Sequence, residues 1–579
     1  MTEAGQQGGG LSPRGKTIAF FVLLGLVLGL PWLGKAGILL AIILGCAVLG
    51  VPLFALIGIV TITCFLLWAE GMDSLNDLTI LVERIRTLAD NNTLLAVPLF
   101  MLSGAIMARG EISKRLIDFS KALIGWIPGG LAVSGVVACM LFAAISGSSP
   151  ATVVAIGAMM GPTLVANGYQ ERFTHGLLTS SGSLGILIPP SIPMILYPLV
   201  NQSAGIETER LFAAGFGPGL VIGGILAGFC VYRGVVGKSK REVFELRTLG
   251  TSFVDGFWSI MFPVVILGGI YTGFFTVVEA SAVSVIYAVV VEIWIHRALR
   301  TREVPKIVAE TGIILGSLLV IMVAALSFSE FLEDQQIPQA AVAWIHSMDL
   351  EPWQFLLALN VLLLMVGMLM DILSAMFVFV PLLAPIAASM GVDPMHFGII
   401  FIVNLEIGYL TPPVGLNLFV ASTLFDKPLG HMIRSVGPFI VLMLAGLAVI
   451  TYVPGVSVGL GNWIIGEETR GAAPTPTEPA LPEALDDEPL GDEPADPEGM
   501  QSLEEMMQEA EEGGAGEDEG GVLSMEEMMQ MAEEGEDPDA PAEDDEGDEP
   551  LDTDEPTPEE LEDPDHVMSL EEMMEAAGD

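Results

Sequence analysis

Apolar segments long enough to cross a bilayer follow one another along most of this chain. A helix needs about 20 predominantly apolar residues to span the hydrocarbon core of a membrane, and twelve stretches between residues 17 and 457 reach or approach that length. The hydrophobic share of the sequence is 52%, which exceeds that of ordinary soluble domains. No stretch alternates polar and apolar residues as the strands of a membrane barrel do. The sequence therefore predicts an all-α polytopic membrane protein.

A proline-rich interruption occurs twice in these apolar stretches. "GILIPPS" at residues 185–191 and "GYLTPPV" at residues 408–414 lie 223 positions apart, and the same offset pairs Gly168 with Gly391. A matched set without gaps indicates an internal repeat. The predicted organisation is a cytoplasmic N-terminus with an additional transmembrane helix at 1–36, a permease domain at 37–465 with repeats at about 37–250 and 251–465, and a disordered acidic tail at 466–579.

Loop charges indicate that the two repeats are inverted. Cytoplasmic loops of membrane proteins collect Lys and Arg. Residues 109–121 carry four basic side chains, whereas their counterparts at 332–344 carry two acidic ones and no Lys or Arg. Inverted repeats with matched, proline-interrupted apolar segments are typical of secondary transporters, whose site lies where the broken helices meet. Because proline breaks a helix and frees carbonyl groups, we expect the two interruptions to bind ions or substrate.

The same charges predict eleven full crossings and two re-entrant hairpins, with the N-terminus inside and the C-terminus outside. The stretch 37–69 is divided at "LGVP" in this scheme because its repeat partner divides at "TGFF". A single long tilted helix at 37–69 is the alternative, and it would reverse the side of everything that follows.

Hydroxyl residues interrupt the apolar run before the first proline motif. The segment "AISGSSPATVVAIG" at 144–157 is typical of a hairpin tip at which two half-helices meet. Hydroxyl and carbonyl oxygens suit a hard cation such as sodium, and a half-helix that begins near Pro150 would direct its positive dipole end at an anion. Close packing of small residues is the alternative. The first predicted cation and substrate site comprises Ser146, Ser148, Ser149 and Thr152, with the backbone around Gly185, Pro189 and Pro190.

The equivalent tip in the second repeat, "MLMDILSAM" at 368–376, contains an acidic residue. An ionisable residue inside a membrane segment is costly and is a functional candidate for that reason. Glu406 lies in the following broken helix, and Glu279 lies near a turn, where either an interfacial or a transport role is open. The second predicted site comprises Asp371, Ser374, Asn404, Gly408, Thr411, Pro412 and Pro413. Sodium is assigned to Ser146, Ser148, Ser149 and Gly185 in the first site and to Asp371, Ser374, Gly408 and Thr411 in the second.

These motifs together resemble the large membrane subunit of the tripartite ATP-independent periplasmic (TRAP) transporters, over roughly residues 37–460. The resemblance implies an elevator-type ion-transporter fold and sodium-coupled uptake of an organic acid in the inner (cell) membrane of a bacterium or archaeon. It implies two partners, a periplasmic substrate-binding protein and a small four-helix membrane subunit, and no cofactor besides sodium as the coupling ion. The additional N-terminal helix and the acidic tail depart from the family pattern. The stretches that carry the resemblance are "NNTLLAVPLFMLSGAIMARG", "SGSSPATVVAIGAMM", "SSGSLGILIPPSIPMILY", "GGIYTGFFTVVEASAV" and "GVDPMHFGIIFIVNLEIGYLTPPVGLNLFVAS".

Two other function classes are weaker. An intramembrane hydrolase needs a base within reach of a serine in "GSSP", but the six histidines fall at segment ends, in loops or in the tail, and no "HExxH" occurs. A passive channel is the stronger alternative. The four cysteines lack metal-ligand spacing, which indicates packing.

The acidic tail holds most of the negative charge. Residues 471–579 contain 42 Asp and Glu and no Lys or Arg, whereas the first 470 residues contain 29 acidic and 23 basic residues. Nucleic acid is therefore excluded as a partner. Three related blocks begin at 502, 524 and 569, each with a Ser-x-x-Glu capping pattern and an apolar stripe. We expect them to fold as helices into the groove of a periplasmic docking partner; a purely solubilising tail is the alternative.

Overall fold

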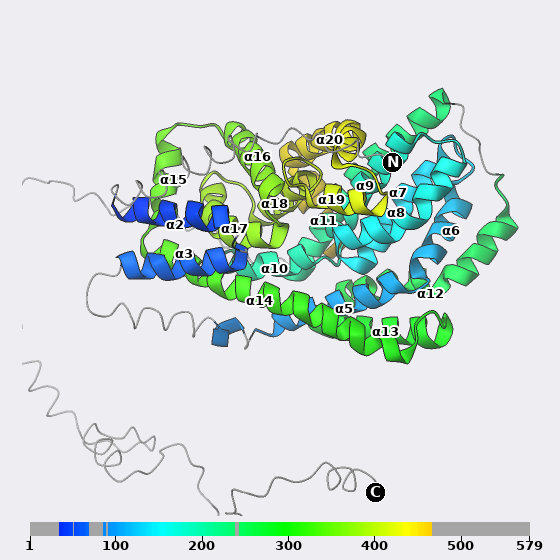
Figure 1. Cartoon of the computed structure of the whole chain (residues 1–579), viewed down its shortest axis with the longest axis horizontal. Coiled ribbons are helices and arrows are strands. Elements are labelled where there is room, and N and C mark those ends of the chain that lie inside the picture. The colour runs from blue at the N-terminus through cyan, green and yellow to red at the C-terminus, as the bar shows by residue number, and fades with distance from the viewer. Residues whose placement is uncertain are drawn as a thin grey trace, which may run out of the picture. The chain divides into compact units, whose positions relative to one another are not determined.

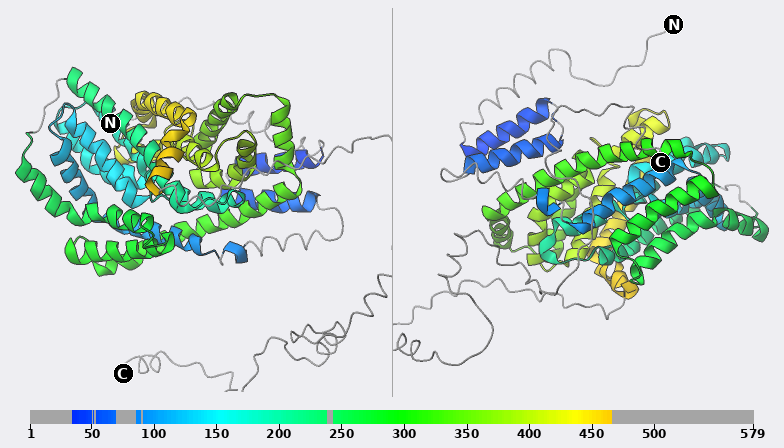
Figure 2. Two further views of the ribbon diagram at one scale, coloured as in Figure 1. Left: turned by 180° about the vertical axis from the view of Figure 1, so that it is seen from behind. Right: turned by 90° about the horizontal axis from the view of Figure 1, so that it is seen from below.

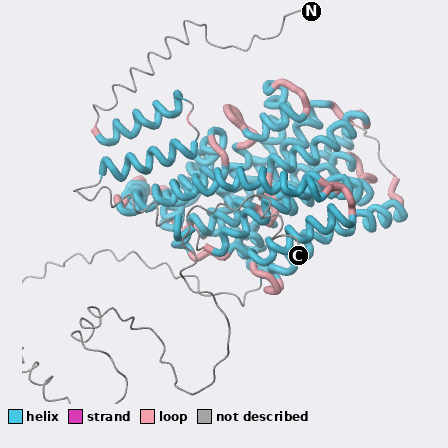
Figure 3. Tube along the Cα trace, turned by 60° about the horizontal axis from the view of Figure 1, so that its bottom comes forward, coloured by secondary structure: helices cyan, strands magenta, loops and turns pink. Residues whose placement is uncertain are grey.

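The computed structural model describes residues 34–49, 51, 53–68, 85–88, 91–237 and 243–465. Within these residues the chain forms helices and connecting loops, and no strand (Figure 3). Nine of the described helices are long and apolar enough to cross a membrane. The expected all-α membrane fold is therefore confirmed. The predicted helix at 17–33 and the three tail blocks lie outside the described residues.

The first repeat begins with two separate helices rather than one long helix (Figure 1). The first helix ends at Leu49 and the second begins at Leu53, so the predicted division of 37–69 at "LGVP" is confirmed. The helices are α2 (Lys35–Leu49), α3 (Leu53–Trp68), η2 (Asn92–Leu95), α5 (Ala96–Arg109), α6 (Ile112–Ile124), α7 (Gly130–Ser146), α8 (Ser149–Ala166), α9 (Glu171–Gly182), η3 (Ser183–Ile186), α10 (Ile192–Val200), η4 (Gln202–Ala204) and α11 (Thr208–Val236).

The second repeat has the same order of α-helices as the first, at an offset of about 223 residues, with one short α-helix added at its end. Its members are α12 (Leu246–Tyr271), α13 (Val277–Val289), η5 (Val290–Ile295), η6 (Thr301–Glu303), α14 (Val304–Asp334), α15 (Ile337–Ser347), α16 (Pro352–Leu369), α17 (Ile372–Ser389), α18 (Pro394–Gly408), α19 (Leu416–Leu424), α20 (Leu429–Tyr452), η7 (Pro454–Val456) and α21 (Val458–Ile465).

Residue-level matches support the repeat. With the offset of 223, both ends of α8 fall on the ends of α17, and the first residue of α9 falls on that of α18. Gly168 and Gly391, which pair in the sequence, both have the left-handed backbone that favours glycine, with φ of 88° and 76°. Both proline motifs contain a cis peptide bond, Pro189–Pro190 and Pro412–Pro413. The expectation of two repeats, each with a hairpin and a broken helix, is thereby confirmed.

The hairpins pack against the broken helices, whereas α13 and α14 both pack along α5. Hairpin α7–α8 packs against α9 and η3, and hairpin α16–α17 packs against α18. On the outside, α14 packs along α3 and α5, and α5 packs along α13 (Figures 1 and 2). Ile313 and Ile314 on α14 are 71% and 58% exposed, as expected for a surface that faces lipid rather than water.

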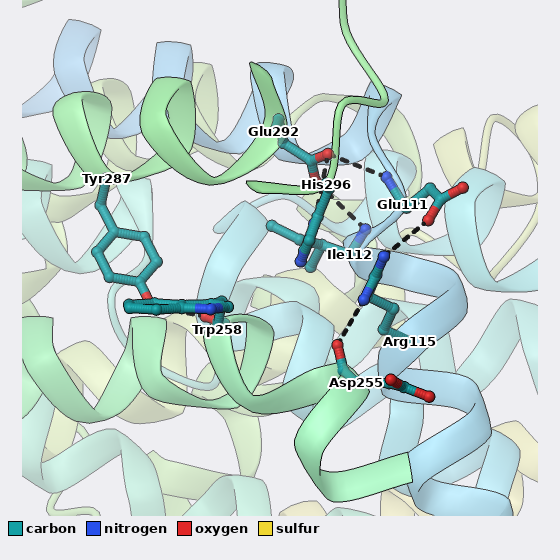
Figure 4. Close-up of polar contacts among 8 residues, drawn as sticks. All are labelled: Glu111, Ile112, Arg115, Asp255, Trp258, Tyr287, Glu292 and His296. Atoms are coloured by element: carbon teal, nitrogen blue, oxygen red, sulfur yellow. Dashed lines mark hydrogen bonds and ion pairs between the residues drawn. The ribbon is translucent and has the colours of Figure 1, made fainter. Parts of the chain in front are cut away.

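A buried carboxylate joins the outer helices of the two repeats. Glu292, in η5 directly after α13, accepts hydrogen bonds from the backbone N–H groups of Glu111 (3.2 Å) and Ile112 (3.3 Å), at the start of α6 (Figure 4). A negative side chain satisfies the free amides at a helix N-terminus and complements its dipole. Arg115 then donates to the carbonyl oxygen of Asp255 on α12 at 2.6 Å. These contacts fix α6 against α12 and η5.

Candidate functional site

The tip of the first hairpin is a cluster of hydroxyl groups. The Ser146 and Thr152 hydroxyls are hydrogen-bonded at 2.9 Å, and the Thr152 hydroxyl donates to the carbonyl oxygen of Ser148, also at 2.9 Å. Gly147, between the two half-helices, has φ of 57°, which a glycine adopts without strain. Three residues predicted for the first site thus lie together, with oxygen atoms directed at one another.

The break in the first broken helix packs directly against this tip. Gly185 lies so close that a Cβ atom there would be 2.7 Å from both the Ser148 carbonyl oxygen and the Thr152 hydroxyl. On the other side of the tip, a Cβ on Gly147 would lie 3.0 Å from the carbonyl oxygen of Pro190. The break, residues 187–191, is buried throughout. The predicted association of the first hairpin tip with the first break is present in the structure.

The second hairpin tip is organised by Asp371. Its side chain accepts hydrogen bonds from the backbone N–H groups of Leu373 (3.1 Å) and Ser374 (3.0 Å) and from the Ser374 hydroxyl (2.6 Å). These contacts make Asp371 the N-cap of α17. The cap explains locally why an acidic residue is tolerated at this depth, and the carboxylate retains further lone pairs that a cation could use.

The break in the second broken helix packs against the second tip in the same way. Gly408, the counterpart of Gly185, lies against Gly367 on α16, where a Cβ would be 2.5 Å from the Gly367 carbonyl carbon. The N–H of Val414 donates to the carbonyl oxygen of Met368 at 3.1 Å. The Thr411 hydroxyl donates to the Ile407 carbonyl oxygen at 2.9 Å, within its own broken helix.

The two breaks differ in exposure. The first is buried, whereas Pro412 is half-buried and Pro413 and Val414 are exposed. Asp371 is also only half-buried. The second hairpin–break pair is therefore the more accessible of the two in this conformation.

The polar residues that precede the second break have separate partners. The Asn404 amide donates to Asn360 Oδ1 at 2.7 Å and to the Ile400 carbonyl oxygen at 2.8 Å, so it joins α18 to α16. Glu406 is fully buried, and its carboxyl oxygens have no hydrogen-bond partner of regular geometry. Ser183 faces Glu406 but donates its proton to the Ser180 carbonyl oxygen at 2.6 Å. Glu279, whose role the sequence left open, forms a capping box with Thr276 at the start of α13.

Two residues that the sequence analysis did not single out lie at the site. Asn417 on α19 donates its side-chain amide to the Ser149 hydroxyl at 2.6 Å. The Tyr409 hydroxyl accepts a hydrogen bond from the backbone N–H of Ile372, at the second hairpin tip, at 2.7 Å. Both residues lie within the segment "GYLTPPVGLN" at 408–417, which contains the second proline motif. A polar side chain in an apolar segment next to a helix break was the available signal.

Three of the described histidines have partners away from the hairpin serines. His175 contacts His431 at 3.4 Å, and His396 contacts the Ser457 hydroxyl at 2.8 Å and the Thr451 carbonyl oxygen at 3.1 Å. A serine nucleophile requires a base that contacts its hydroxyl. The Ser149 hydroxyl instead contacts an amide, which disfavours the hydrolase alternative.

Comparison with known proteins identifies the family of the chain. Residues 40–456 match the family described as "Tripartite ATP-independent periplasmic transporter, DctM component". The chain is 42% identical over 401 residues to the C4-dicarboxylate TRAP transporter large permease protein DctM of Pseudomonas aeruginosa, covering 67% of this chain and 92% of that one. It is 34% identical over 426 residues to the ectoine TRAP transporter large permease protein TeaC of Halomonas elongata, covering 73% and 98%.

A solved structure shares the fold. The chain resembles the crystal structure of the Alcanivorax borkumensis YdaH transporter with a TM-score of 0.52 and 15% sequence identity, over 71% of this chain and 97% of that chain. That likeness concerns the fold alone. The relatives named here are transporter permeases. Because the family match spans most of the sequence, the chain belongs to the family of DctM components, the large permeases of TRAP transporters.

Proposed function

We propose that this chain takes up a small organic acid anion by sodium-coupled secondary active transport. One observation carries the proposal. Gly185 and Gly408, which lie 223 residues apart at matched positions of the two repeats, each allow a helix break to pack directly against a hairpin tip. Each pair gathers hydroxyl, carboxylate or carbonyl oxygens of the kind that hard cations prefer. Two such pairs would bind sodium, and the positive end of α8 would face an anionic substrate.

We infer that the hairpins and broken helices move as a unit against the outer helices. A cavity of about 170 Å³ supports this division, because residues of α14 line it together with residues of α10 and α17. Gln202 also lines the cavity and lies at a loop that the charge pattern assigns to the outside. An elevator-type displacement would use this boundary.

The expected partners are a periplasmic substrate-binding protein and a separate small four-helix membrane subunit, in the inner membrane. One relative, the isethionate TRAP transporter permease protein DctMQ of Oleidesulfovibrio alaskensis, is 37% identical, and the chain covers 58% of its length.

Relatives at 42%, 40% and 36% identity are named as C4-dicarboxylate permeases. A C4-dicarboxylate is therefore the first substrate to assay.

Reconstitution of the chain with its small subunit in liposomes tests the proposal. Labelled dicarboxylate should enter only with an inward sodium gradient and the binding protein outside. Liposomes preloaded with unlabelled substrate should show counterflow, which a channel does not support. Uptake that is independent of sodium, or that persists without the binding protein, would contradict the proposal.

A further inference from the structure

A line of hydrogen bonds connects the two hairpin tips through α19 and the second break. At one end, the side-chain amide of Asn417 donates to the hydroxyl of Ser149, the first residue of α8, at 2.6 Å. The backbone N–H of the same residue donates to the carbonyl oxygen of Tyr409 at 3.1 Å. At the other end, the Tyr409 hydroxyl accepts from the N–H of Ile372, the first residue of α17, at 2.7 Å.

Burial makes each of these contacts costly to lose. Ser149 and Asn417 are fully buried, and Ile372 and Tyr409 are 3% and 4% exposed. A buried donor or acceptor that loses its partner carries the full penalty of its desolvation. If one tip moved alone, these hydrogen bonds would break in a buried region where water cannot replace them. A displacement of either tip would therefore favour a displacement of the other.

One atom of the line is unused. The Asn417 side-chain oxygen, Oδ1, is buried and has no hydrogen-bond partner. It belongs to the same amide group that contacts Ser149, so it lies beside the predicted ligands of the first site. Buried polar atoms are nearly always satisfied, and an amide oxygen beside hydroxyl and carbonyl oxygens is the kind of atom that a hard cation binds.

We propose that Asn417 is a positioning residue that couples the two candidate cation sites, and that its Oδ1 atom is an additional oxygen ligand of the first. The proposal rests on the proposed function for the nature of the ligand, but the mechanical coupling of the tips does not. Occupancy of the first site would hold Asn417, and through Tyr409 it would stabilise the second tip; by reciprocity, the second site would strengthen the first.

Hydrogen exchange of the full chain with its small subunit in lipid nanodiscs tests the coupling, with and without sodium. The variants are Asn417→Leu, which removes the amide, and Tyr409→Phe, which removes only the hydroxyl. Asn360→Leu is the matched control, because it also removes a buried inter-helix amide contact (2.7 Å from Asn404) but lies off the line. Asn417→Leu should accelerate exchange about tenfold in peptides at both tips, 147–152 and 370–376, as the loss of one ordinary hydrogen bond implies. Tyr409→Phe should do the same at 370–376.

Uptake measurements with the same proteins test the ligand assignment. Asn417→Leu should raise the sodium concentration for half-maximal uptake at least tenfold, and Asn417→Asp, which keeps an oxygen there and can accept from the Ser149 hydroxyl, should restore most of it. Acceleration confined to 147–152, or an equal effect of Asn360→Leu at both tips, would overturn the coupling. Sodium-independent uptake by the unmodified transporter would instead reject the proposed function, and exchange without sodium would still decide whether the tips are coupled.

Discussion

Ser183 and Glu406 occupy matched positions in the two repeats, 223 residues apart, and their side chains face each other in the buried centre of the protein. The short helical segment η3, which carries Ser183, packs against α18, which carries Glu406. The contact shows that the two broken helices meet at matched positions of the two repeats. A carboxyl group with no regular hydrogen bond lies at this meeting point.

Replacing Glu406 by methionine should make the protein more stable and less active. An apolar side chain of similar size removes a buried polar group without a partner, which stabilises by about 1–3 kcal/mol. Thermal unfolding in detergent should therefore shift to a higher temperature, while dicarboxylate uptake falls at least tenfold. The control is Glu279→Met, which removes an exposed helix cap and should lower the unfolding temperature. A lower unfolding temperature for Glu406→Met would show that the carboxyl stabilises the fold.

A methyl group at either matched glycine should separate a hairpin tip from its break. Gly185→Ala places a Cβ atom 2.7 Å from the Ser148 carbonyl oxygen, and Gly408→Ala places one 2.5 Å from Gly367. Because both neighbours are backbone, neither can yield cheaply, and we expect uptake to fall at least tenfold in each variant. Gly224→Ala on α11 is the matched control, since nothing lies within 4 Å of its Cβ position. Equal uptake by all three variants would mean that close approach of tip and break is unnecessary.

The sequence predicts much of this architecture but only part of the site. The doubled proline motif predicted which tip meets which break, because a repeat transfers one arrangement to the other half. The capping roles of Asp371 and Glu279 could also be predicted, because both patterns are local. Asp is a preferred N-cap residue, and Thr followed three residues later by Glu is the pattern of a capping box. The contact of Asn417 with Ser149 was not, because the two residues lie 268 positions apart. Helical periodicity shows which face of a helix is apolar, but it does not show which side chain from a distant part of the sequence packs against that face.

Cysteine labelling tests the predicted topology. Gln202 and Thr301 are both exposed, and the loop charges place the first outside and the second in the cytoplasm. In a variant without the four native cysteines, an impermeant reagent added to intact cells should label a cysteine at Gln202 and not one at Thr301. Labelling of Thr301 alone would reverse the orientation of the repeats.

The three tail blocks should act as docking segments. Tail peptide should retain a specific protein from the periplasmic fraction, because each block presents an apolar stripe and three blocks give avidity. Met506→Asp, Met528→Asp and Met573→Asp together should abolish that retention by placing a charge in each stripe. Equal retention by the triple variant would favour a solubilising tail.

The sodium dependence of uptake by two single variants tests the central claim most directly. Ser149→Ala removes a hydroxyl at the first tip, and Asp371→Ala removes the carboxylate at the second. Each should raise the sodium concentration for half-maximal uptake, while sufficient sodium restores transport. If both variants keep the sodium dependence of the unmodified protein, the two hairpin tips are not the sites at which the coupling ion binds.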